Sequence, residues 1–131
     1  MNKSFDMYMT LDELVEEAWQ NSEDHGFHTP LKNFTPEGRD NYIALKLALI
    51  HSEVSEALEE LREGNHGALM KEVRVFEALQ GDKPVGFMSE LADIMIRVAD
   101  LAGIVGGDLG LAVHLKMEYN KSRPPKHNKA F

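Results

Sequence analysis

Hydrophobic residues recur along the chain with the spacing of α-helices, and glycine and proline interrupt these recurrences. The first such stretch begins after Thr10, where the letters TLDE (10–13) have the spacing of a capping box. In that motif the Thr10 side chain accepts a hydrogen bond from the backbone N–H of Glu13. Gly26 is a natural stop. The pattern therefore predicts a helix from about residue 11 to the residues before Gly26, followed by a proline-punctuated loop over 27–38.

Three further helices are expected at about 40–63, 87–105 and 109–122, the last two separated by Gly106-Gly107 and capped by Asp108. A short amphipathic segment at about 67–79 predicts one extra short helix. No stretch alternates in the way a strand does. The fold class predicted is all-α, a four-helix-bundle-like arrangement in one domain spanning residues 1–131.

Composition narrows the classes of function. The net charge is −8, which disfavours a nucleic-acid polymer as partner because such a surface would be basic. The chain has no cysteine, so disulfides and thiolate metal sites are excluded. No apolar run reaches the roughly 18 residues of a membrane span, and the first residues lack the apolar core of a targeting segment. We expect no membrane partner and a cytoplasmic protein.

Two pairs of acidic residues lie at the border between apolar and polar helix faces. At about 100° per residue, Glu53 and Glu56 fall on one edge of the apolar stripe of the 40–63 helix. Glu90 and Asp93 occupy the same position on the 87–105 helix. If the two helices pack through their stripes, four carboxylates converge. Glu59 and Glu63 lie farther round and are expected to face water.

Four converging carboxylates repel one another unless cations neutralise them or some stay protonated. Hard oxygen ligands without cysteine favour Mg²⁺, or Mn²⁺, over Zn²⁺. The alternative is that each pair is an ordinary solvated helix edge, with Arg97 simply pairing with Asp93 at i+4. On the last helix, Lys116, Asn120 and Arg123 share a face and can bind phosphate oxygens; the alternative there is a solvated basic helix end.

These motifs together resemble the MazG-like all-α NTP pyrophosphatase superfamily. The resemblance rests on ExxE at Glu53 and Glu56, ExxD at Glu90 and Asp93, and K-x-x-x-N-x-x-R at Lys116, Asn120 and Arg123, over roughly residues 8 to 124. The letters GFHTP (26–30) are similar to a loop of the dCTP pyrophosphatase branch, in which a histidine and a tryptophan line the base pocket. His28 and Trp19 are the candidates here. Ser52 stands where many members have a first glutamate, and base preference is not carried over.

The resemblance implies a Mg²⁺-dependent enzyme that cleaves a nucleoside triphosphate to the monophosphate and pyrophosphate. Glu53, Glu56, Glu90 and Asp93 would bind the metal, and Glu53 or Glu56 would take the proton of the attacking water. A homodimer or dimer of dimers with a shared pocket is expected. Two alternatives are phosphoribosyl-ATP pyrophosphatase, from the same superfamily, and a non-catalytic helical interaction protein.

Overall fold

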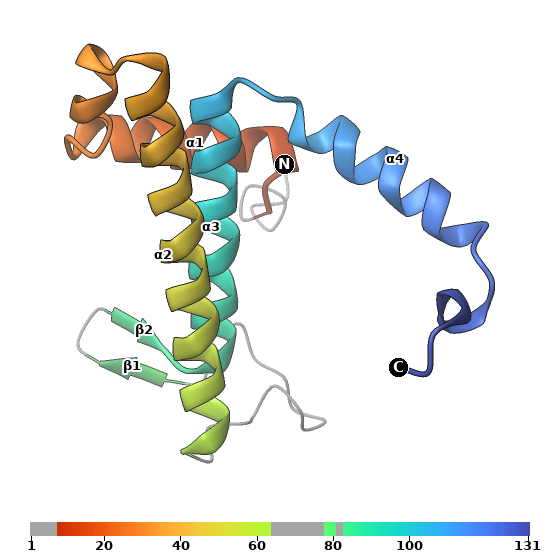
Figure 1. Ribbon diagram of the computed structural model, residues 1–131. Coiled ribbons are helices and arrows are strands. Elements are labelled where there is room, and N and C mark those ends of the chain that lie inside the picture. The colour runs from red at the N-terminus through yellow and green to blue at the C-terminus, as the bar shows by residue number, and fades with distance from the viewer. Residues whose placement is uncertain (1–7, 64–77, 81–82) are drawn as a thin grey trace, which may run out of the picture.

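Four α-helices make up most of the part of the chain that the structure describes. The structure, a computed structural model, describes residues 8–63, 78–80 and 83–131. Figure 1 shows its helices and strands, which have the following bounds: α1 Leu11–Asp24, α2 Pro36–Arg62, β1 Ala78–Gln80, β2 Lys83–Val85, α3 Phe87–Val105 and α4 Leu109–Lys121. Short 3-10 helices follow α1 (Thr29–Asn33) and α4 (Pro125–Asn128). The predicted all-α fold class is confirmed.

The predicted helix ends are confirmed where local chemistry sets them. The Thr10 hydroxyl accepts a 3.2 Å hydrogen bond from the backbone N–H of Glu13, and Asp108 caps α4 in the same way. Gly106 ends α3 in the left-handed conformation, with φ 72°, where a side chain would be strained.

The second helix starts earlier than the sequence pattern indicated. We predicted a start near residue 40, but α2 begins at Pro36. Thr35 is its N-cap, and the Thr35 hydroxyl accepts a 3.1 Å hydrogen bond from the N–H of Gly38. Proline suits the first helical position because its ring fixes φ and it needs no backbone partner there. The loop predicted over 27–38 is therefore shorter than expected.

A small hairpin replaces the end of the extra helix predicted at about 67–79. Ala78 and Leu79 lie in β1, which pairs with β2 as two antiparallel strands. The rest of that predicted segment lies outside the described residues. Strands of three residues are too short to display a repeating period of two, so the sequence pattern gave no sign of them.

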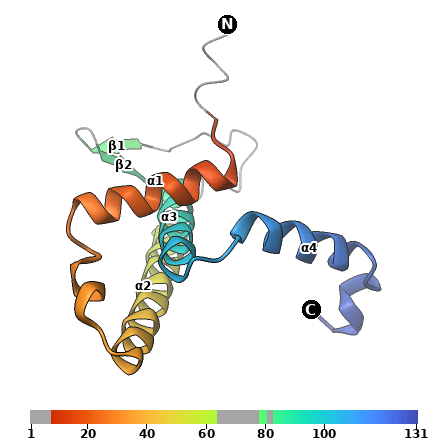
Figure 2. The same cartoon turned by 90° about the horizontal axis from the view of Figure 1, so that it is seen from above.

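Helices α2 and α3 lie antiparallel and side by side, and α1 crosses both near one end of the pair (Figures 1 and 2). The α4 helix projects away from this unit, and its main contacts within the chain are with α1. The bundle-like core of one chain is therefore made by α1, α2 and α3, and α4 does not lie along the α2–α3 pair.

The core of one chain is small. Among the described residues, the buried hydrophobic side chains are Ala18, Tyr42, Ala57 and Ala99, and no large side chain is fully buried. Three charged or polar residues are buried with them: His28, Glu53 and Asp100. Large hydrophobic side chains stay exposed along α4, including Leu115 and Met117, each 58% exposed. One protomer thus leaves much apolar helix surface facing solvent.

Within the described residues, no single helix has the length and apolar composition needed to cross a membrane. The α3–α4 pair, bent by 114° at its connection, meets those two criteria jointly.

Close packing of α1 on α3 depends on Gly103. A Cβ added there would lie 2.8 Å from Cδ1 of Trp19 and 3.0 Å from its Cβ. We expect Gly103→Ala to destabilise the fold by about 1–2 kcal/mol, because overpacking outweighs the roughly 1 kcal/mol that alanine gains over glycine in a helix. Denaturant unfolding measures this. The control is Gly110→Ala, where the near atom is the end of the Asp12 side chain; if both variants lose equal stability, the Trp19 contact is not the cause.

Candidate functional site

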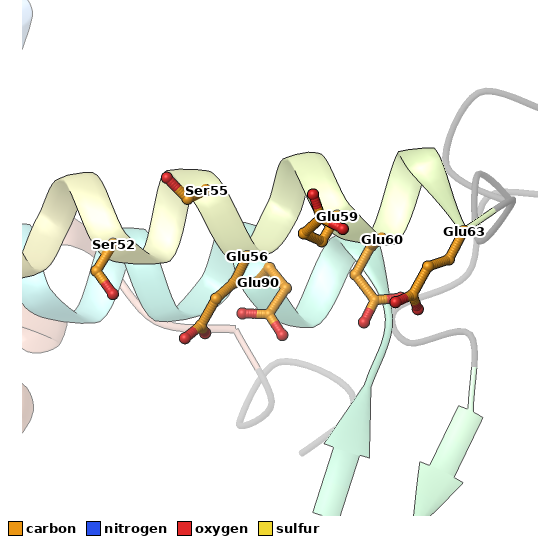
Figure 3. A pocket seen from close by; sticks show the side chains of 7 residues that line it. All are labelled: Ser52, Ser55, Glu56, Glu59, Glu60, Glu63 and Glu90. Carbon is orange, nitrogen blue, oxygen red and sulfur yellow. The ribbon is translucent and has the colours of Figure 1, made fainter.

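Packing of α2 against α3 brings the two predicted acid pairs to one place. One carboxylate oxygen each of Glu53, Glu56 and Glu90 lies within 4.8 Å of the others, a spacing that a single cation can bridge. Figure 3 shows Glu56 of α2 beside Glu90 of α3. Asp93 is the fourth predicted residue, and its charge interacts with Glu53 and Glu90. The structure therefore brings together the four acids that the sequence nominated. We call these four residues the acid cluster.

The surroundings of Glu90 favour the protonated form of its side chain. Burial raises its pKa to about 6, and the neighbouring charges of Glu56, Asp93 and Glu53 add to the effect. Its Oε2 atom is buried and has no hydrogen-bond partner. A buried carboxylate oxygen without a hydrogen-bond partner is costly, so this atom is a candidate ligand for a cation.

Arg97 forms an ion pair with Glu53. The alternative reading of the sequence paired Arg97 with Asp93, but its Nε donates a 2.5 Å hydrogen bond to Oε1 of Glu53. Glu53 is only 7% exposed, so this ion pair compensates a buried charge. Burial and Glu53 raise the pKa of Asp93, whereas the charges of Arg97 and Lys83 lower it.

A shallow hollow continues from the cluster along α2 (Figure 3). Its lining includes Ser52, Glu60 and Glu63 besides Glu56 and Glu90. Glu63 is exposed, as expected, and in the figure its carboxylate turns toward that of Glu60. Glu59 points the other way and pairs with Arg62, at 3.1 Å. Ser52 thus borders the acidic surface.

His28 and Trp19, the predicted base-pocket residues, pack against each other, and both contact other residues of the protein. The Nε2 of His28 lies 2.8 Å from Asp100 Oδ1, and its Nδ1 lies 3.0 Å from Glu23 Oε2. A carboxylate therefore lies against each ring nitrogen of His28. The Trp19 ring packs 5.1 Å from His28 and also against Gly103. His28 ties the loop after α1 to α3.

Lys116, Asn120 and Arg123 lie on α4 and just beyond it. The Lys116 ammonium and the Arg123 guanidinium both lie over the ring of Tyr119, at 5.5 and 5.8 Å from its centroid. The structure therefore brings the two cations together, as predicted. It does not bring them to the acid cluster of the same chain, because α4 projects away from α2 (Figure 1).

A second cleft, of about 310 Å³, adjoins the cluster between the end of α1, α2 and α3. Glu53, Asp93 and Arg97 line it, together with Phe27 of the GFHTP segment and five residues that the sequence reasoning did not nominate: Asn21, Ser22, Lys46, Ile96 and Asp100. For Asp100, the sequence itself carried a signal. Asp100 follows Asp93 by seven residues, or about two helical turns, and so lies on the same face of α3.

Comparisons of the chain with models of protein families, with curated proteins and with solved structures found no match.

The raised pKa of Glu90 predicts a specific pH dependence. A carboxyl group with a folded-state pKa of about 6 and an ordinary value of 4.5 binds its proton more tightly in the folded state. Its contribution to stability is therefore full below pH 4.5 and is lost as the pH rises to about 6. In metal-free buffer, Glu90→Gln should become progressively more stable than the wild type across this window, as thermal melts at a series of pH values will show.

Glu17→Gln, on the exposed side of α1, is the control for this measurement. The difference in melting temperature between Glu17→Gln and the wild type should stay constant across this pH window. A constant difference between Glu90→Gln and the wild type from pH 4.5 to 6 would contradict the assignment of the raised pKa to Glu90.

Proposed function

We propose that this protein is a Mg²⁺-dependent nucleoside triphosphate pyrophosphohydrolase of the MazG-like kind. The observation that carries the proposal is the convergence of Glu53, Glu56 and Glu90 from two helices, with one buried oxygen of Glu90 left without a partner. A solvated helix edge does not require that arrangement. The ordered motifs of the sequence agree with this proposal.

The donor set fits Mg²⁺, with Mn²⁺ as a substitute. All the candidate ligands are carboxylate oxygens, and the described part of the cluster includes no histidine. When bound, the metal would neutralise the triphosphate and lower the pKa of a bound water. Asp93, whose charge interacts with Glu53, is the fourth candidate ligand.

The protein's own groups have separable roles in the hydrolysis. Arg97 holds Glu53, so the exposed Glu56 is better placed to accept the proton of the attacking water. The water oxygen bonds to the α-phosphorus, the bond from that phosphorus to the α–β bridging oxygen breaks, and pyrophosphate leaves with that oxygen. Lys116 and Arg123 would stabilise the charge on the phosphoryl oxygens.

The position of α4 supports a shared site in a homodimer or a dimer of dimers. The predicted phosphate-binding residues lie away from the acids of their own chain, and α4 carries exposed apolar side chains along its length. A second copy that covers these side chains would bring its Lys116 and Arg123 toward the acid cluster. The interface would then complete the site as well as bury apolar surface.

Magnesium and the substrate test the proposal directly. We expect Mg²⁺ to raise the melting temperature and a panel of canonical and modified NTPs and dNTPs to include at least one that yields pyrophosphate. Glu53→Gln with Asp93→Asn should abolish the Mg²⁺ shift and lower kcat/KM by roughly 100-fold or more, because the metal ligands are removed.

The control is again Glu17→Gln, which should retain both the shift and the activity. If Mg²⁺ causes no stabilisation and no nucleotide yields pyrophosphate, the chain is better explained as a non-catalytic helical interaction protein. Cleavage of phosphoribosyl-ATP alone would assign it to the other enzyme of the superfamily.

Mixed oligomers test whether the site is shared. One inactive chain carries Glu53→Gln with Asp93→Asn, and the other carries Lys116→Gln with Arg123→Gln. If α4 serves the partner's acids, refolding the two variants together should restore up to about a quarter of wild-type activity, because each mixed dimer regains one intact site. Pyrophosphate release measures this, and each variant alone is the control. No restored activity in proven mixed dimers would place both halves of the site in one chain.

A further inference from the structure

The cleft between α1, α2 and α3 has features of a ligand site that the acid cluster alone does not explain. Its volume of about 310 Å³ is in the range of small-molecule pockets. It shares Glu53 and Asp93 with the cluster, so a molecule bound to a metal at the cluster can extend into it without a break. Its other walls carry an aromatic ring, an amide and cations, which is a different chemistry from that of the acidic hollow along α2.

Phe27 presents an exposed ring at this cleft on a fixed backbone. Its side chain is 59% exposed. The hydroxyl of the buried Tyr42 donates a 2.5 Å hydrogen bond to the Phe27 carbonyl oxygen. The backbone N–H of Phe27 donates a hydrogen bond to the carbonyl oxygen of Ser22. The adjacent His28 is anchored to Asp100. An aromatic ring that is exposed while its backbone is held on both sides is a suitable surface for stacking a planar ligand.

Lys46 supplies a cation at the same end of the cleft. Its ammonium lies 5.7 Å from the centroid of the Phe27 ring and 5.0 Å from that of Tyr42. Within the described part of the chain, its interactions are with these rings and include no carboxylate. The ammonium therefore retains N–H donors for an acceptor on a ligand that lies against Phe27.

The two ends of the cleft differ in the ligand groups they suit. Lys46 precedes Glu53 by seven residues, which is about two turns and about 10 Å along α2. Arg97 lies at the cluster end, bonded to Glu53, and Phe27 with Lys46 lies at the far end. A ligand spanning the cleft thus meets metal-binding carboxylates and a guanidinium at one end, and an aromatic ring with an ammonium at the other.

We propose that this cleft seats the nucleoside part of the substrate, with Phe27 stacked on the base and Lys46 donating to a carbonyl oxygen on the base edge. The inference rests on the proposed pyrophosphohydrolase function. It gives His28 and Trp19 a supporting role, since the nitrogens of His28 are bound to Asp100 and Glu23. Adenine is the common base without a carbonyl oxygen, so adenine nucleotides bind most weakly.

Calorimetric titration in Mg²⁺ separates the base end from the phosphate end. The ligands are non-hydrolysable α,β-imido nucleoside triphosphates of each base, and inorganic triphosphate as a probe without a base. Phe27→Ala should weaken binding of the imido nucleotides by about tenfold or more, the size of a lost base–aromatic stack, and leave inorganic triphosphate unchanged. Lys46→Gln should weaken the carbonyl-bearing nucleotides several-fold and the adenine nucleotide least. In turnover, both variants should raise KM more than they lower kcat.

Phe131→Ala and Lys32→Gln are the matched controls, as exposed residues of the same types outside the cleft. Circular dichroism melts confirm that each variant is folded. If the wild type binds the imido nucleotides but Phe27→Ala and Phe131→Ala bind them with equal affinity, the cleft does not seat the base. The pyrophosphohydrolase proposal would stand in that case. Strongest binding of the adenine nucleotide overturns the role of Lys46. If the wild type binds no nucleotide and releases no pyrophosphate, both proposals fail.

Discussion

The packing of α2 against α3 is the constraint on which the candidate site depends. It forces acidic residues from two helices to within a few ångströms of one another. Carboxylates at such separations repel one another unless cations or protons compensate their charge. Two features of the structure compensate part of this charge. Arg97 pairs with Glu53, and the pKa of Glu90 is raised to about 6. Neither feature gives the buried Oε2 atom of Glu90 a hydrogen-bond partner.

A second buried polar network determines the shape of the nearby cleft. His28 bridges Asp100 on α3 and Glu23 on α1, and so fixes the start of the loop that carries Phe27. Tyr42 holds the same loop from α2. Three helices are thereby joined at one end of the molecule by side chains whose loss would leave buried polar atoms without partners. This arrangement places an exposed aromatic ring in the cleft that adjoins the acid cluster, without requiring a large hydrophobic core.

The small core has a consequence for assembly. In the described part of the chain, the buried apolar residues are three alanines and one tyrosine, whereas α4 leaves leucine and methionine side chains in solvent. Apolar surface of this extent on a projecting helix is typical of an interface. The cations of α4 are also remote from the acids of their own chain, so the same association that covers the helix can complete the site. Stability and activity would then depend on protein concentration together.

The sequence by itself determined the helices and the pairing of acids on their faces. Periodic apolar residues, the Thr10 and Asp108 caps and the glycine at position 106 act locally, so their effects can be read without a fold. Helical spacing likewise placed Glu53 with Glu56 and Glu90 with Asp93 before their convergence was seen. The three-residue strands of the hairpin and the start of α2 at Pro36 were missed, because short elements carry too little pattern.

Only the tertiary structure decided which charges compensate one another and where the cleft opens. Arg97 pairs with Glu53 across forty-four positions of sequence, and His28 with Asp100 across seventy-two. Phe27 lies in the GFHTP segment and Lys46 in no motif, and loop and helix packing brings the two together. Such contacts join distant segments, and their energies depend on burial and distance in three dimensions. Helical periodicity specifies the face of a helix, but the partner of that face is set by how the helices pack.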